Sequence, residues 1–186
     1  MNENETRPAP LLLLGDPRLR RPSAPVEDPG GDAFRAGCRR LHATLAEFRA
    51  RHGFGRAVSA PQIGLAQRFI AINLGGTPFT IINPEITARS NATFTLWDDC
   101  MSFPDLLVRV RRHRSISLRY VDEQGVPCTM DELDEATSEL LQHEIDHLDG
   151  VLAVDRALDR DAIIYRRVFD ADRPRFAALV DYVIGA

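Results

Sequence analysis

Two histidines four residues apart, with a glutamate beside the first, are the residues of this sequence best suited to chemistry. Segment 142–147 reads Gln-His-Glu-Ile-Asp-His. Histidines at this spacing project from one face of a helix, about one turn apart, and can grip one metal ion. Such an ion activates a water, and Glu144 takes and returns its proton, which is metal-assisted hydrolysis. The alternative is that His143 and His147 are polar surface residues of an amphipathic helix.

A tetrahedral catalytic site needs a third protein ligand, and its identity separates the classes of metalloenzyme. The third histidine of the metzincin pattern would fall at position 153, which is alanine. No glutamate follows Glu144, which excludes a zincin with a downstream glutamate ligand. Asp155 and Asp159 stay open as ligands of a metallopeptidase. The remaining soft ligand is a cysteine.

Cys100 is the best candidate among three cysteines. It follows a predicted strand and precedes the turn marked by Pro104, so a ligand there would be held rigidly. Cys128 lies in a polar turn and Cys38 on the apolar face of a predicted helix, where we expect structural roles. The cysteines are widely spaced and odd in number, which favours reduced thiols over a disulfide framework.

A loop of small residues at 53–64 contains Gln62. Glycine and alanine let backbone approach a substrate closely, and the Gln62 amide can donate to a developing oxyanion. Without the other two motifs, this loop would be interpreted as a turn between a helix and a strand.

The three motifs, in this order, resemble the peptide deformylases. That family carries a Gly-rich loop ending in Gln, a Glu-Gly-Cys-Leu-Ser segment and a Gln-His-Glu-x-Asp-His helix, and the third motif matches fully at 142–147. The resemblance extends to Gly-Asp-Pro-Arg-Leu-Arg at 15–20 and Ile-Asn-Pro at 82–84, and covers most of residues 11–156.

The resemblance implies the following roles. Cys100, His143 and His147 would hold one divalent metal ion, Fe²⁺ by preference, with Zn²⁺, Ni²⁺ or Co²⁺ as other candidates. Glu144 would be the general base and acid. The implied reaction removes the N-formyl group from N-formyl-methionyl peptides of nascent proteins and releases formate, with the ribosome as a candidate partner. A paralogue acting on another formylated or acylated substrate stays an alternative.

The resemblance also implies how the substrate is held. Gln62 and the backbone N–H of Met101 would stabilise the oxyanion. Four residues would bind the peptide: Gly55, Ala57, Asp99 and Leu140.

The sequence departs from the family pattern at five positions in the first two motifs: Ala57 and Asp99 for Gly, Ser59 for Ala, Asp98 for Glu and Met101 for Leu. Asp99 is the most consequential, because it adds a β-carbon and a negative charge beside the peptide. We expect modest activity on short formyl-methionyl peptides and a higher kcat/KM for Asp99→Gly, unless the side chain turns to solvent.

The composition limits the other possible functions. All 23 basic residues are arginine, which excludes Schiff-base, P-loop and Ser/Lys chemistry. The net charge of -4 gives no pull toward nucleic acid, and no apolar run is long enough to span a membrane. We therefore expect a cytoplasmic protein with no DNA or membrane partner. The basic run at 109–114 is interpreted as a solvated strand face or as a source of partners for Asp98 or Asp146.

The elements that must position these residues follow from periodicity and turn signals. The 186 residues predict a single α+β domain of mostly antiparallel strands packed around a central helix carrying H-E-x-x-H, with an N-terminal and a C-terminal helix. The expected elements are an extended arm at 1–31, a helix with an apolar face at 34–48 and Asp32 available as its cap, strands at 69–74, 79–82, 93–97 and 115–121, a helix at 135–149, and a helical tail at 158–186 interrupted near Pro174.

Overall fold

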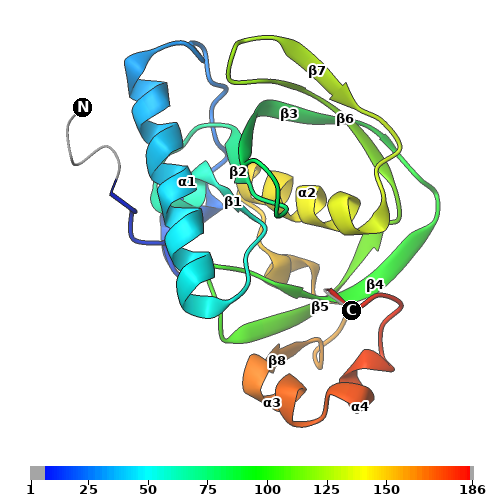
Figure 1. Ribbon diagram of the computed structural model, residues 1–186. Helices are drawn as coiled ribbons and strands as arrows, with labels where there is room; N and C mark the ends of the chain where they lie inside the picture. Colours follow the sequence, from blue (N-terminus) through cyan, green and yellow to red (C-terminus); the bar gives the residue numbers. More distant parts are fainter. Residues whose placement is uncertain (1–6, 185–186) are drawn as a thin grey trace.

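Helix α2 (Glu135–Leu148) lies at the centre of the molecule, between two antiparallel sheets (Figure 1). The computed structural model describes residues 7–184. The other helices are α1 (Asp32–His52), α3 (Arg166–Ala171) and α4 (Arg173–Ala177). The strands are β1 (Ala57–Ser59), β2 (Phe69–Ile72), β3 (Phe79–Arg89), β4 (Thr93–Asp99), β5 (Leu106–His113), β6 (Ile116–Val121), β7 (Pro127–Met130) and β8 (Ile163–Tyr165).

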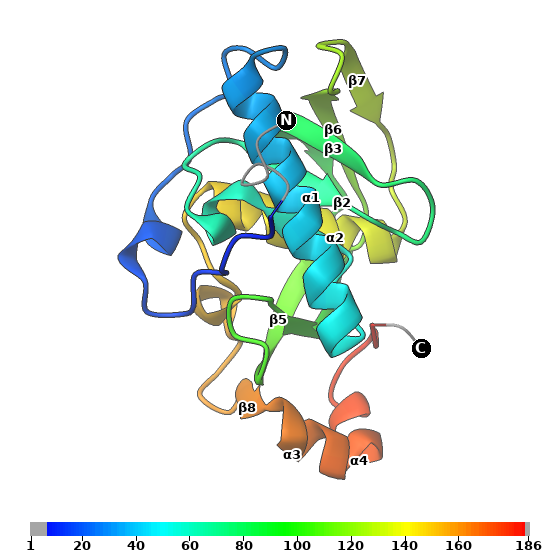
Figure 2. The ribbon, with the colours of Figure 1, turned by 60° about the vertical axis from the view of Figure 1, so that its left-hand side comes forward.

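The larger sheet has the strand order β1-β2-β3-β6-β7, and the smaller sheet has the order β4-β5-β8. Every pairing between these strands is antiparallel. Figure 2 shows α1 crossing the outer face of the larger sheet, with α2 behind that sheet. The α+β fold with a central helix, predicted from the sequence, is therefore confirmed.

Strand β2 explains why the larger sheet has a helix on each face. Its side chains alternate between two apolar clusters. Phe69 and Ala71 pack with the residues of α1, whereas Ile70 and Ile72 pack with those of α2. All four are buried, so β2 is an unbroken apolar run without the polar alternation of a half-exposed strand.

Helix α2 is buried from Ser138 to Leu148, which is unusual for a helix with so many polar residues. Its first turn is capped by the Asp134 carboxylate, which accepts a hydrogen bond from the backbone of Thr137. Its end is fixed by Gly150, which has a φ of 75°; a β-carbon there would lie 2.6 Å from the Arg20 carbonyl oxygen. The helix is thus held at both ends while its middle points charged groups inward.

Three local predictions need correction. Residues Asn83 and Pro84 do not end a strand, because β3 runs through them with a register shift and Asn83 takes a φ of 52°. The tail is broken near Pro174, as expected, because α3 ends at Ala171 and α4 begins at Arg173; however, both helices are short, and strand β8 precedes them. Gly31, not Asp32, occupies the cap position of α1. Within the arm at 1–31, residues 1–6 lie outside the described residues.

Within residues 7–184, no helix combines the length and the apolar character that crossing a membrane would require.

Candidate active site

Three buried side chains meet where α2 passes the end of β4. The Cys100 Sγ lies 3.2 Å from His147 Nε2, which lies 3.2 Å from His143 Nε2. The two histidines share a face of α2 because they are four residues apart. Cys100 is the first residue after β4, and the Phe103 backbone N–H donates to its carbonyl oxygen, which fixes the turn.

This donor set fits a divalent transition-metal ion. A thiolate and two imidazole nitrogens suit iron or zinc, and bond lengths of about 2.0–2.3 Å put tetrahedral ligands about 3.3–3.8 Å apart. The observed separations of 3.2 Å lie close to that range. The other ring nitrogen of His143, Nδ1, lies 3.0 Å from the Asp98 carboxylate, an arrangement that orients a ligating histidine.

Behind these three side chains, alternating charges link β4, β5, α2 and the turn at 153–156. Arg112 Nη2 lies 2.9 Å from Asp98, and its other terminal nitrogen bonds to Asp146. Arg156 closes the chain with two 2.5 Å hydrogen bonds to Asp146. Burial alone would raise the pKa of Asp98, but His143 and Arg112 hold that pKa well below its usual range. The expected arginine partner of Asp98 and Asp146 is therefore Arg112.

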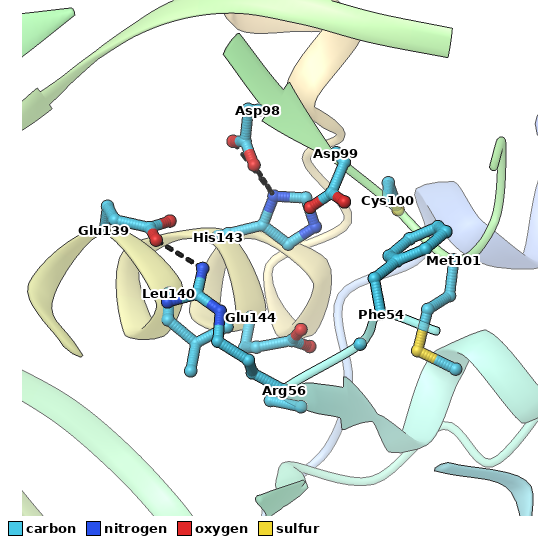
Figure 3. Close-up of a pocket in the computed structure, with 12 residues that line it drawn as sticks. Phe54, Arg56, Asp98, Asp99, Cys100, Met101, Glu139, Leu140, His143 and Glu144 are labelled. Carbon is cyan, nitrogen blue, oxygen red and sulfur yellow. Dashed lines mark hydrogen bonds and ion pairs between the residues drawn. The ribbon is translucent and has the colours of Figure 1, made fainter. Parts of the chain in front are cut away.

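Glu144 follows the first histidine, and its side chain lies in the cleft beside the ligands (Figure 3). The Ser59 hydroxyl contacts Glu144 twice, bonding to the carboxylate and lying 2.9 Å from the backbone carbonyl oxygen. Burial raises the pKa of Glu144, whereas His143 and Ser59 act in the opposite direction. Ser59, a departure from the family pattern, thus restrains the group expected to transfer protons.

Gln62 is held beside the same thiol. Its amide nitrogen donates to the Ser102 hydroxyl at 3.1 Å and lies 3.7 Å from Cys100 Sγ. Its amide oxygen accepts from the Ser59 backbone N–H at 2.9 Å. The amide orientation is therefore set by one donor and one acceptor, and the donor end faces the ligands.

A cleft opens beside the ligands, lined by residues from the loop before β1, the end of β4 and one face of α2 (Figure 3). All four residues expected along a peptide line it: Gly55, Ala57, Asp99 and Leu140. Met101 lines it as well. Gly55 has a φ of 108°, and a β-carbon there would lie 3.3 Å from the Phe48 ring, so glycine suits this wall of the cleft.

An ion pair that the sequence does not predict lies inside this cleft. Arg56 bonds to the carboxylate of Glu139, whose side chain is 1% exposed (Figure 3). Burial raises the pKa of Glu139 to about 7, although Arg56 acts in the opposite direction. The available signal was the spacing of Glu139 and His143, which lie four apart on α2 and so share a face. Phe54 also lines the cleft and was not predicted.

The aspartate ligands considered for a metallopeptidase are occupied elsewhere. Asp155 pairs with Arg20 and accepts from the Leu152 backbone N–H. Asp159 pairs with Arg109 at 2.6 Å. Neither belongs to the group of ligand atoms that gathers around the two histidines, and Cys100 does.

Comparisons with known proteins agree with this geometry. The sequence model of the polypeptide deformylase family matches residues 8–162. The chain belongs to the peptide deformylase family. A peptide deformylase of Treponema pallidum is 37% identical over 172 residues, which cover 91% of this chain and 96% of the relative.

Solved peptide deformylases share the fold. The crystal structure of the Thermotoga maritima peptide deformylase matches with a TM-score of 0.74 at 31% identity. The match covers 82% of this chain and 99% of the Thermotoga chain. A class I type b peptide deformylase from Acinetobacter baumannii, with Met-Ala-Ser bound, has a TM-score of 0.72 at 25% identity and covers 81% and 99%. As a peptide deformylase, this chain is a metal-dependent hydrolase, and its cysteine–histidine cluster is the candidate metal site.

Proposed function

We propose that this peptide deformylase removes the N-formyl group from N-formyl-methionyl peptides, with Cys100, His143 and His147 holding the catalytic metal ion. The observation that carries the proposal is the meeting of one sulfur and two imidazole nitrogens beside a buried glutamate. Fe²⁺ is the proposed ion, and Zn²⁺, Ni²⁺ and Co²⁺ are the other candidates. The proposed location is the cytosol, where nascent chains emerge from the ribosome.

The ion supplies Lewis-acid activation of a water and of the formyl carbonyl when it is bound. Glu144 accepts a proton from the attacking water and delivers it to the amine nitrogen as the C–N bond breaks. The oxygen of that water remains in formate, and the peptide leaves with a free amine. Ser59 holds the carboxylate of Glu144 in place, which limits the reorganisation needed during proton transfer.

Gln62 would stabilise the oxyanion together with the Met101 backbone N–H. Replacing Gln62 with leucine is expected to lower kcat by about 10²-fold, the usual scale for one oxyanion donor. Steady-state kinetics with a formylated tripeptide would measure the change, and Ser102→Ala, which removes only the partner of the Gln62 amide, serves as the control. An effect confined to KM would instead make Gln62 a ground-state binder.

The peptide would lie in the cleft between the loop before β1 and the end of β4. Strand β1 is an edge strand, so its outer side can pair with an extended backbone. Gly55 and Ala57 line the cleft next to this edge, and Leu140 presents an apolar surface from α2. The Acinetobacter relative holds Met-Ala-Ser, a peptide with the free N-terminal methionine that deformylation would leave.

The Asp99 carboxylate does not face the expected peptide path as an unpaired charge, because it is paired with an arginine. Its carboxylate lies 3.1 Å from Arg166 Nη2, and the Arg166 guanidinium sits 4.3 Å from the centre of the Phe54 ring. The negative charge is therefore largely balanced, while the β-carbon that glycine lacks remains beside the cleft.

We expect Asp99→Gly to raise kcat/KM for formyl-Met-Ala-Ser, but by about fivefold or less, because a partly exposed ion pair contributes at most about 1 kcal/mol. Arg166→Met is the matched variant, since it leaves the Asp99 charge unbalanced and should lower kcat/KM. If Asp99→Gly gains nothing and Arg166→Met loses nothing, Asp99 is a tolerated variation without influence on substrate choice.

Formate release decides the function. The protein, loaded with Fe²⁺ without air, would be assayed with formyl-methionyl, acetyl-methionyl and unmodified peptides. We expect formate from the first substrate only. Cleavage of an internal peptide bond would favour a peptidase, and turnover of other formylated amines alone would favour a paralogue with another substrate.

A further inference from the structure

A second group of metal-ligating side chains lies on the opposite side of the larger sheet from α2. Cys38 and His42 belong to α1, and Glu123 belongs to the turn between β6 and β7. Figure 2 shows the first half of α1 next to that turn, at the end of the molecule away from α3 and α4. One ligand atom from each of the three residues lies within 4.8 Å of the other two.

The spacing of these atoms resembles that of metal ligands. The Glu123 Oε1 lies 3.9 Å from Cys38 Sγ and 3.8 Å from His42 Nε2. Ligands of a tetrahedral ion are about 3.3–3.8 Å apart for bonds of about 2.0–2.3 Å. The Thr80 hydroxyl lies 2.8 Å from the imidazole nitrogen and 3.1 Å from the sulfur, so a fourth polar atom closes the group.

Two local features aim these side chains at one point. Cys38 and His42 are four residues apart on α1, the same spacing as the histidines of the active site. The turn is shaped by Asp122, whose carboxylate accepts from two backbone N–H groups, and by Gly125 with a φ of 80°. Asp122 is thus occupied within the turn, while Glu123 reaches across to α1.

The charges of the group suit a divalent cation. Burial lowers the pKa of His42, which keeps the imidazole neutral and able to bind metal. Burial also raises the pKa of the Cys38 thiol, and the neighbouring Glu123 carboxylate acts in the same direction. The raised pKa keeps the thiol protonated without metal, so an ion would have to displace that proton and would then be neutralised by one thiolate and one carboxylate.

We propose that Cys38, His42 and Glu123 bind a second divalent ion of the zinc type, which fastens the β6–β7 turn to α1. The thiolate and imidazole select a transition metal over Mg²⁺ or Ca²⁺. The side chain of Glu123 is 43% exposed and that of His42 is 24% exposed, so the ion can enter from the surface without passing the peptide cleft. The site stands apart from the catalytic ligands and does not depend on the proposed reaction.

Zinc content tests this site. After equilibration with excess zinc and removal of free metal, the wild-type chain should hold two zinc ions. The variants Cys38→Ser and Glu123→Gln should hold one ion and retain deformylase activity. Cys128→Ser changes a thiol of the adjoining strand β7 and should hold two. A single ion in the wild type, or a second ion that survives Cys38→Ser, overturns the proposal.

Cobalt absorption identifies the ligands. In Cys100→Ala protein, Co²⁺ should produce a thiolate charge-transfer band from Cys38, and Cys38→Ser should abolish it. Glu123 lies in an exposed turn outside the core, so Glu123→Gln should not disturb the fold. This variant should weaken Co²⁺ binding at least about tenfold, which is the smallest effect expected even from losing a residue that only supports a metal ligand. An unchanged affinity in that variant would overturn the three-ligand site. Circular dichroism would show that each variant is folded.

Discussion

Cys100→Ala is expected to abolish tight binding of the catalytic ion and, with it, formate release. Removing the thiolate leaves two imidazoles, which cannot complete a three-ligand site. The Cys100→Ala protein and its reference protein should both also carry Cys38→Ser, so that metal analysis counts the catalytic site alone. The metal content should then fall from one equivalent to none, and the ion-dependent gain in Tm should disappear.

Full metal content in the Cys100→Ala protein would remove Cys100 from the ligand set. It would require another ligand, and Asp155 or Asp159 would then have to leave its arginine partner. Cys128→Ser in the same background is the matched control and should keep both metal and activity. The comparison therefore separates a ligand from a thiol whose loss merely disturbs the fold.

Glu144→Gln should leave the metal in place and reduce kcat by about 10²-fold or more, the usual scale for a general acid–base group. Glutamine keeps the size of the side chain and its contact with Ser59 but cannot carry the proton. Single-turnover kinetics and metal analysis on the same sample would measure both outcomes. Near wild-type turnover would remove Glu144 from the mechanism.

Two variants sharpen this test. Glu135→Gln alters a glutamate at the exposed start of α2 and should leave kcat unchanged. Ser59→Ala removes the hydroxyl that restrains Glu144 but leaves its carboxylate, so its loss of rate should be smaller. If Ser59→Ala equals Glu144→Gln, the hydroxyl itself takes part in proton transfer.

The local part of the active site could be predicted from the sequence. A spacing of four residues places His143 and His147 on one face of any helix, and the capping signals around α2 are also local. Cys100 could be chosen because few other soft ligands exist in the chain. The family resemblance joined these pieces, and the fold positions them within bonding distance of one ion.

The long-range part could not be predicted. Arg56 and Glu139 are 83 residues apart, and nothing in either segment identifies the other as its partner. The sequence predicts only a structural role for Cys38, because Glu123 lies on a hairpin 85 residues away. The strand through Asn83 was missed because turn-forming residues also occur at bulges. Sequence periodicity indicates which residues share a face of a helix or strand, whereas contacts between distant segments depend on the topology of the fold.

The chain of charged side chains behind α2 links the candidate metal site electrostatically to solvent, by a route separate from the substrate cleft. Of its members, Arg156 reaches solvent, with 44% of its side chain exposed, whereas Arg112 is 3% exposed. A change at Arg156 would alter the charge felt by Asp146, then Arg112, then Asp98, and so the basicity of a ligating imidazole. Metal affinity at the candidate site is therefore open to adjustment, by selection or by engineering, from a side chain that does not line the cleft.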